Sequence, residues 1–104
     1  MRRPMHPDVN SLSLPRVLHA LSDPVRLKVV KQIWRTGGQT CTALNLLNDM
    51  PKSTASHHFR VLRESGIINM SPQGTHMINT IRKDDLDHCF PGLLDAILNA
   101  PDTE

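Results

Sequence analysis

Apolar residues recur in this chain at the spacing of an α-helix and never in a long run, which favours short amphipathic helices around one small core. Leucine and valine follow an i, i+3, i+4, i+7 pattern within residues 13–22, which predicts a first helix. A second helix is predicted from Pro24 to about Arg35, a short third one after Thr40, and a fourth over about 52–65. A chain of 104 residues has room for one such domain.

The predicted second helix has a clear start signal and two distinct faces. Asp23 can accept hydrogen bonds from the first free backbone N–H groups, and Pro24 suits the first helical turn. We expect the buried face to consist of Leu27, Val30, Ile33 and Trp34. We expect the cationic side chains to lie on another face, namely Lys28, Lys31 and Arg35. The two glycines at 37–38 then end the helix.

A β-hairpin is predicted directly after the fourth helix. Gly66 followed by the apolar Ile67 is typical of a helix that ends in a Schellman motif. Two β-rich runs follow, at 67–70 and 77–81, and residues 71–74 (Ser-Pro-Gln-Gly) place Pro and Gly where a type I turn favours them. The expected fold class is therefore mainly α with a small β-hairpin.

The two ends of the chain differ from its middle. Residues 1–12 are rich in Pro and polar residues and are expected to form a flexible arm, while 101–104 form a short tail. A last helical segment is expected over 84–100, broken or kinked by the Pro-Gly pair at 91–92. The folded domain is thus expected to span 13–100.

Charge is distributed unevenly along the chain, although the formal net charge is only +2. Residues 1–83 hold all 12 Lys and Arg with four acids, a formal charge of +8, whereas 84–104 hold six acids and no Lys or Arg. A basic body suits a polyanionic partner. Because the chain lacks both a membrane-length apolar run and a signal-peptide core, and has only two cysteines, we expect a cytoplasmic protein. Either Met1 or Met5 could be the natural start.

The fourth predicted helix carries the main functional signal. Its apolar stripe, which faces the core, consists of Ala55, Phe59 and Leu62. The other side presents groups that suit phosphates and base edges: Lys52, Ser53, Thr54, Ser56, His57 and Arg60. No acid occurs before Glu64, whereas an ordinary solvated helix mixes Glu with Lys. The third and fourth helices therefore form a candidate helix-turn-helix, with the fourth in the major groove of DNA.

The tip of the hairpin would add further DNA contacts at the neighbouring backbone or minor groove. Its residues are Gln73, Gly74, Thr75 and His76. The alternatives are an ordinary polar surface helix followed by an ordinary exposed turn, or a domain of this shape that binds only proteins. The salt dependence of duplex binding distinguishes these readings, because contacts to phosphates release counterions.

Two stretches resemble the ArsR/SmtB family of winged-helix transcriptional repressors. They are residues 18–27 (LHALSDPVRL) and 53–66 (STASHHFRVLRESG), and the likeness extends over 17–82. The resemblance implies a winged helix-turn-helix with a three-helix core, a wing and an additional C-terminal helix. It also implies a homodimer that pairs through its first and last helices (13–22 and 84–100) and binds a pseudo-palindromic double-stranded operator. The interface would then consist of Leu14, Val17, Leu18, Leu21, Leu93, Leu94, Ile97 and Leu98.

The same resemblance implies repression that an effector relieves, but the effector stays open. The family's two-cysteine metal motif is represented here by Thr40, Cys41 and Thr42, and one thiolate is a poor site for a soft metal. A site from Asp85, His88 and Cys89 is the remaining metal candidate, and Cys41 with Cys89 is the candidate redox pair. We favour two buried, inert cysteines and a surface cluster that binds nothing, so neither a metal site nor a redox site is predicted.

No enzyme is predicted. Neighbouring serines and histidines at 53–58 point apart on a helix and cannot form a nucleophile–base pair. No Gly-rich phosphate loop and no cofactor motif occurs, so no cofactor is expected.

Overall fold

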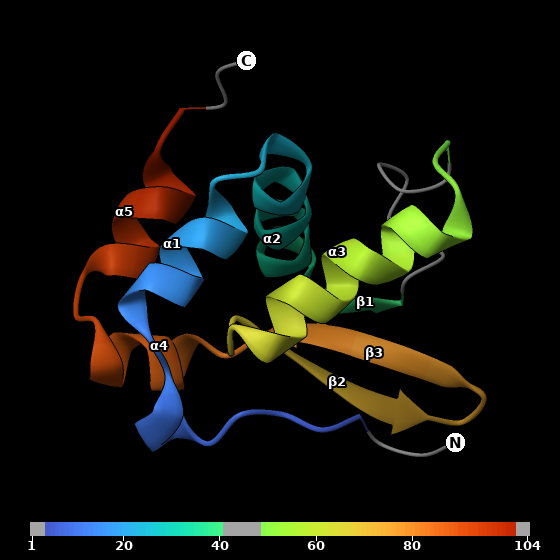
Figure 1. Ribbon diagram of the computed structural model, residues 1–104, viewed down its shortest axis with the longest axis horizontal. Helices are drawn as coiled ribbons and strands as arrows, with labels where there is room; N and C mark the ends of the chain where they lie inside the picture. Colours follow the sequence, from blue (N-terminus) through green and yellow to red (C-terminus); the bar gives the residue numbers. More distant parts are fainter. Residues whose placement is uncertain (1–3, 41–48, 102–104) are drawn as a thin grey trace.

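Helices α2 and α3 lie over a small antiparallel sheet, and α1 packs beside α2, in the computed structural model, which describes residues 4–40 and 49–101 (Figure 1). The elements are a 3-10 turn η1 (Val9–Ser11), α1 (Leu14–Leu21), α2 (Pro24–Thr36), β1 (Gln39–Thr40), α3 (Lys52–Glu64), β2 (Ile68–Gln73), β3 (His76–Ile81), α4 (Lys83–Cys89) and α5 (Leu93–Asn99). The expected mainly α class with a hairpin is confirmed. The third helix predicted from sequence falls on 41–48, outside the described residues.

The sheet has three strands in the order β1-β3-β2, one more than the predicted hairpin. The additional strand, β1, pairs Gln39 with Asn79 and Thr40 with Ile78. Asn79 is fully buried, and its Nδ2 donates to the carbonyl of Gln39 at 3.0 Å. This buried amide helps to hold β1 against the middle of the sheet, because a buried polar group needs a partner.

The hairpin turn lies two residues beyond the predicted position. Gln73 pairs with His76, so the turn consists of Gly74 and Thr75, and Gly74 has a φ of 63°. A two-residue hairpin turn requires positive φ, which glycine adopts without strain. Pro72 stays within β2 because β2 is an edge strand, where a missing N–H costs no ladder bond.

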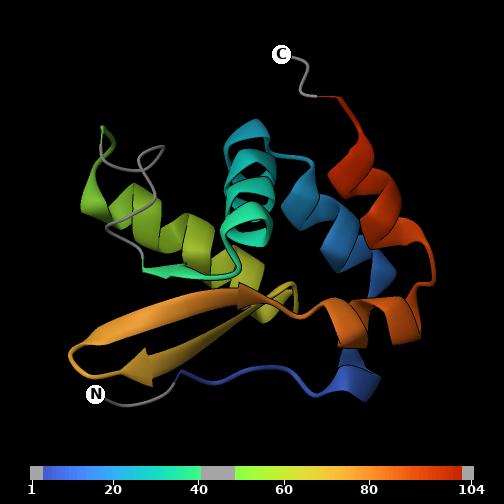
Figure 2. The same ribbon diagram turned by 180° about the vertical axis from the view of Figure 1, so that it is seen from behind.

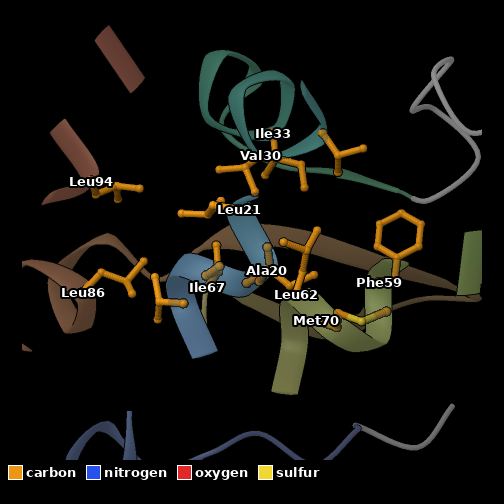
Figure 3. Packing of buried hydrophobic residues seen from close by; sticks show 13 residues of the cluster. Ala20, Leu21, Val30, Ile33, Phe59, Leu62, Ile67, Met70, Leu86 and Leu94 are labelled. Atoms are coloured by element: carbon orange, nitrogen blue, oxygen red, sulfur yellow. The ribbon is translucent and has the colours of Figure 1, made fainter. Parts of the chain in front are cut away.

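Side chains from the helices and the sheet form one continuous core (Figure 3). Its members are Val17, Ala20, Leu21, Val29, Val30, Ile33, Phe59, Leu62, Ile67, Ile68, Met70, Leu86 and Leu94. The apolar stripe predicted for α3 is thus buried at Phe59 and Leu62 and partly buried at Ala55. This packing leaves the opposite side of α3 to solvent.

Two predictions about α2 are wrong. Trp34, expected in the core, is 42% exposed, with the ammonium of Lys83 5.9 Å from its ring centroid. Lys31, expected on an open face, is 6% exposed, and its Nζ donates to the carbonyl of Ala100 at 2.7 Å. The end of the chain covers the side of α2 that the charge pattern assigned to solvent, and Lys31 is satisfied there by a carbonyl.

The predicted cap of α2 is confirmed. Asp23 Oδ1 accepts hydrogen bonds from the N–H groups of Val25 at 2.8 Å and Arg26 at 3.1 Å. Partial burial raises the pKa of the Asp23 carboxyl, but the Arg26 N–H, the Arg26 guanidinium and the Val25 N–H outweigh it, so the net pKa lies below 3.8. The carboxylate therefore stabilises the folded state through its ionised form.

Asp23→Ala is expected to lower the free energy of unfolding by about 1 kcal/mol at neutral pH, because two N–H groups lose their acceptor. A depressed pKa means that this stabilisation is present above the ordinary value of 3.8 and is lost as pH falls through the lower folded value. Urea unfolding from pH 7 to pH 3 measures both effects. Asp23→Asn keeps a hydrogen-bond acceptor without the charge, so its free energy of unfolding at pH 7 should fall less than that of Asp23→Ala. Equal losses of stability in the two variants would contradict the capping role.

Residues 4–12, expected to form a flexible arm, contact the domain at several points. The N–H of Met70 in β2 donates to His6 Nε2 at 2.9 Å, and Arg82 Nη1 donates to the carbonyl of Pro7 at 2.9 Å. The thiol of Cys89 lies 3.3 Å from the carbonyl of Val9. The arm thus runs beside the outer edge of β2, which would otherwise be open (Figure 1).

The C-terminal segment consists of two helices. The break at Phe90–Gly92 was predicted, and Gly92 has a φ of 82°. Lys83 joins the two helices through Asp87 of α4 and, at 3.3 Å, Asp95 of α5. These two hydrogen bonds raise the pKa of the Lys83 ammonium, Asp87 contributing more than Asp95. The acids of the C-terminal segment are in this way partly neutralised by local partners.

Candidate nucleic-acid interface

The exposed side of α3 is the centre of the candidate interface. Its side chains, all exposed, are Lys52, Ser53, Thr54, Ser56, His57 and Arg60. We call these six residues the α3 edge. Neither Lys52 nor Arg60 has an ion-pair partner among the described residues. The cations of the α3 edge are therefore available to a polyanion.

The start of α3 is suited to a phosphate. The residue before it, Pro51, provides no side-chain cap, and the first turn contains no acid. The first N–H groups of a helix have no partner within the helix, and they carry the positive end of its dipole. In α3 these groups therefore lie next to the cationic side chain of Lys52.

The hairpin tip lies on the same side of the molecule as the start of α3. Both are at the right in Figure 1 and at the left in Figure 2. The four predicted tip residues, Gln73, Gly74, Thr75 and His76, are all exposed. The acidic α4–α5 segment lies at the opposite end of the molecule (Figures 1 and 2). Helix α3 and the hairpin can therefore approach one duplex together, with the acids turned away from it.

Two residues that were not predicted to contribute to DNA binding contact one another beside the α3 edge: Arg26 of α2 and His58 of α3. His58 is half-buried, and its Nδ1 lies 3.2 Å from Nη1 of Arg26, whose side chain is almost fully buried. No local sequence pattern predicts that an arginine is buried. The Asp23-Pro24 pair at the start of α2 does predict that Arg26 lies close to the capping carboxylate of Asp23. The partner of His58 thus comes from another helix, α2.

The residues expected at a dimer interface fall into three groups. Leu14 and Leu18 are 41% and 47% exposed on α1. Leu93, Ile97 and Leu98 are partly buried against the core. Val17, Leu21 and Leu94 are at most 8% exposed, because they pack into the core of their own subunit. The apolar surface left open by this subunit therefore belongs to the first two groups.

The metal and redox candidates do not form a site within the described residues. Asp85 pairs with Arg82 at 3.0 Å, Cys89 approaches the carbonyl of Val9, and His88 is exposed. No group of three or more possible metal ligands occurs in 4–40 and 49–101. Cys89 is a free thiol, and Cys41 lies outside the described residues.

Comparisons with known proteins place this geometry in a family. Residues 21–71 match the family described as "Helix-turn-helix domain". The uncharacterized HTH-type transcriptional regulator YceK of Bacillus subtilis (strain 168) is 28% identical over 83 residues, which cover 79% of this chain and 83% of YceK. The structure of the ArsR family transcriptional regulator RHA00566 is similar, with 25% identity, a TM-score of 0.62, and coverage of 88% of this chain and 91% of that chain. Residues 21–71 thus carry a helix-turn-helix domain, and the chain has the fold of the ArsR-family winged-helix regulators.

Two further structures resemble this chain. The transcriptional repressor BigR from Xylella fastidiosa shares 25% identity and a TM-score of 0.57, over 74% of this chain and 85% of BigR. The homodimeric winged helix-turn-helix DNA-binding domain of Mb0332 from Mycobacterium bovis is 22% identical, with a TM-score of 0.63, over 88% of this chain and 84% of that domain. The relative YceK and these structures are described as regulators or repressors of transcription. None of its described helices has the length and apolar character to cross a bilayer.

Proposed function

We propose that this chain is a homodimeric repressor that binds a pseudo-palindromic operator in the cytoplasm and leaves it when an effector binds. The observation that carries the proposal is the α3 edge, six exposed polar or cationic side chains without an acidic partner at the uncapped start of a helix. Mb0332 is described as homodimeric, and BigR as a transcriptional repressor. Residues 13–100 would form the DNA-binding domain, with the dimer helices at its two ends.

In the proposed complex, α3 enters the major groove and the hairpin lies along the neighbouring backbone or minor groove. The α3 edge would supply the groove contacts, and Gln73 to His76 the contacts beside it. The two α3 helices of a symmetric dimer would be separated by one DNA turn, ~34 Å, so each α3 would contact one half-site. The exposed parts of Leu14 and Leu18, with those of Leu93, Ile97 and Leu98, would form the contact between subunits.

Selection of bound duplexes from a random pool tests the proposal. We expect a recovered site with two inverted half-sites about ten base pairs apart, and an affinity that falls steeply as salt rises. The logarithm of the affinity should fall linearly with the logarithm of the salt concentration, because nearly one counterion is released for every phosphate that the protein neutralises. Recovery of no enriched site, together with weak duplex binding even at low salt, would instead indicate a winged-helix domain that binds proteins.

Arg60→Ala is expected to weaken binding to every duplex by roughly tenfold and to reduce the salt slope by about 1 per subunit, because a phosphate loses its cation. Substitutions of Thr54 or His57 should instead change the preferred sequence. Filter binding at several salt concentrations measures both. Arg16→Ala is the matched control, because Arg16 is also exposed but lies on α1. An unchanged slope for Arg60→Ala would remove Arg60 from the interface.

A further inference from the structure

A single buried guanidinium joins the end of α1 to the middle of α3. The side chain of Arg26 starts from α2, and the residue is 7% exposed. Its Nε donates to the carbonyl of Ala20 at 2.8 Å, and its Nη2 lies 3.4 Å from the carbonyl of His19. Both carbonyls belong to the last turn of α1, and that of His19 also accepts from the N–H and Oγ of Ser22.

The third contact of this guanidinium reaches α3. Arg26 Nη1 lies 3.2 Å from Nδ1 of His58, and 4.0 Å from Oδ2 of the capping Asp23. A guanidinium has only donors, so a hydrogen bond between these two atoms requires Nδ1 of His58 as the acceptor and the ring proton on Nε2. The contact therefore selects one tautomer of one histidine.

We infer that Arg26 is a positioning residue that couples the placement of α1 to the orientation of the α3 edge. The inference rests on the proposed function, in which α1 carries the subunit contact at Leu14 and Leu18 and α3 carries the DNA contact. A buried charge that loses one of its partners is costly, so the α1 carbonyls and the His58 ring move together. His57, the next residue along α3, is exposed on the α3 edge and moves with His58.

This coupling gives a route by which a change between subunits reaches DNA. A displacement of α1 at its exposed leucines shifts the two carbonyls that hold Arg26. Because loss of His58 would leave the buried guanidinium without one of its partners, the displaced guanidinium pulls His58 and rotates α3 about its axis. The α3 edge is then presented to the groove in another orientation, without any change in the edge itself.

The contact can be tested without DNA. A long-range ¹H–¹⁵N spectrum of the imidazole groups at neutral pH, assigned by comparison with His58→Asn, reports the tautomer of each histidine. We expect His58 to be neutral with the proton on Nε2, and to lose this single form in Arg26→Lys, which cannot hold all three acceptors. A His58 that is protonated on Nδ1 in the wild-type chain would overturn the inference.

The coupling role is tested with a matched set at position 58. The Oδ1 of His58→Asn can replace Nδ1 as acceptor, whereas His58→Gln presents its polar atoms farther out and His58→Leu has no acceptor. We expect operator affinity close to wild type for His58→Asn and roughly tenfold weaker for His58→Leu, with His58→Gln resembling leucine. Dimer dissociation should vary little across the set. The melting temperature of His58→Leu should fall, because the buried guanidinium loses an acceptor, so operator affinity is measured well below the melting temperature of every variant. Equal operator affinities for asparagine and leucine would overturn the coupling.

The outcomes of these tests separate this inference from the proposed function. If the wild-type chain binds no duplex, the proposed function fails, and the tautomer measurement still decides whether Arg26 and His58 are paired. If the wild-type chain binds its operator and Arg60→Ala weakens binding, but the variants at position 58 all bind alike, the proposed function holds and the coupling fails. If the affinity of His58→Leu falls only at temperatures where this variant begins to unfold, Arg26 has a structural role alone.

Discussion

Alanine at Gly66 is expected to lower the free energy of unfolding by about 2–4 kcal/mol. Gly66 ends α3 with a φ of 86°, donating to the carbonyl of Arg63 at 3.0 Å, while Ile67 donates to that of Leu62 at 3.1 Å. These bonds form the Schellman motif that the sequence predicts. A side chain there is strained by the left-handed backbone, and its Cβ would collide with Cδ2 of Leu12.

Urea unfolding of Gly66→Ala measures this loss, and two variants separate its causes. Gly92 has a similar φ of 82° but no neighbour within 4 Å of an added Cβ, so Gly92→Ala should show only the backbone cost of about 1–2 kcal/mol. Adding Leu12→Ala to Gly66→Ala should relieve the collision. If Gly66→Ala and Gly92→Ala lose the same stability, Leu12 does not pack on Gly66 in solution.

The double substitution Leu14→Ala with Leu18→Ala is expected to weaken the dimer by on the order of a thousandfold. Both side chains are close to half exposed in the single subunit, and burial of the remainder contributes about 1 kcal/mol each. In a symmetric dimer each substitution acts twice, so four leucine contacts are lost. Sedimentation velocity over a range of concentrations measures the shift from dimer to monomer.

A suitable control removes apolar surface away from the proposed interface. Met5 is 86% exposed in the arm, so Met5→Ala should leave the association unchanged. Circular dichroism should show that the double leucine variant keeps its helices, because Val17, Ala20 and Leu21 still anchor α1 in the core. A double variant that remains dimeric at the same concentrations would exclude this face of α1 as the subunit contact.

The features that the sequence predicts correctly are those set by interactions within a few residues. The Asp23 cap, the Schellman ending at Gly66 and the break before α5 each depend on backbone groups and side chains that are neighbours in the chain. The exposure of the α3 edge also follows from local periodicity, because Phe59 and Leu62 determine which side of the helix is buried.

The hairpin shows where local preference is insufficient. Residues 71–74 contain Pro and Gly in an order that suits a type I turn, but pairing of Gln73 with His76 moves the turn to Gly74 and Thr75. The longer strands gain more backbone pairing, and Pro72 is tolerated because its side of β2 faces outward. Strand β1 has only two residues, and it exists because Asn79 and its neighbours in β3 lie beside it.

Local periodicity in the sequence thus determined the helices, their caps and the acid-free edge of α3. Tertiary structure alone decided that Lys31 is covered by the end of the chain, that Trp34 is left exposed, and that Arg26 lies buried between α1 and α3. The physical reason is that a helix's own pattern specifies which sides differ in polarity, whereas burial depends on which distant segment packs against each side. A charged residue can be buried wherever such a segment supplies its hydrogen-bond partner.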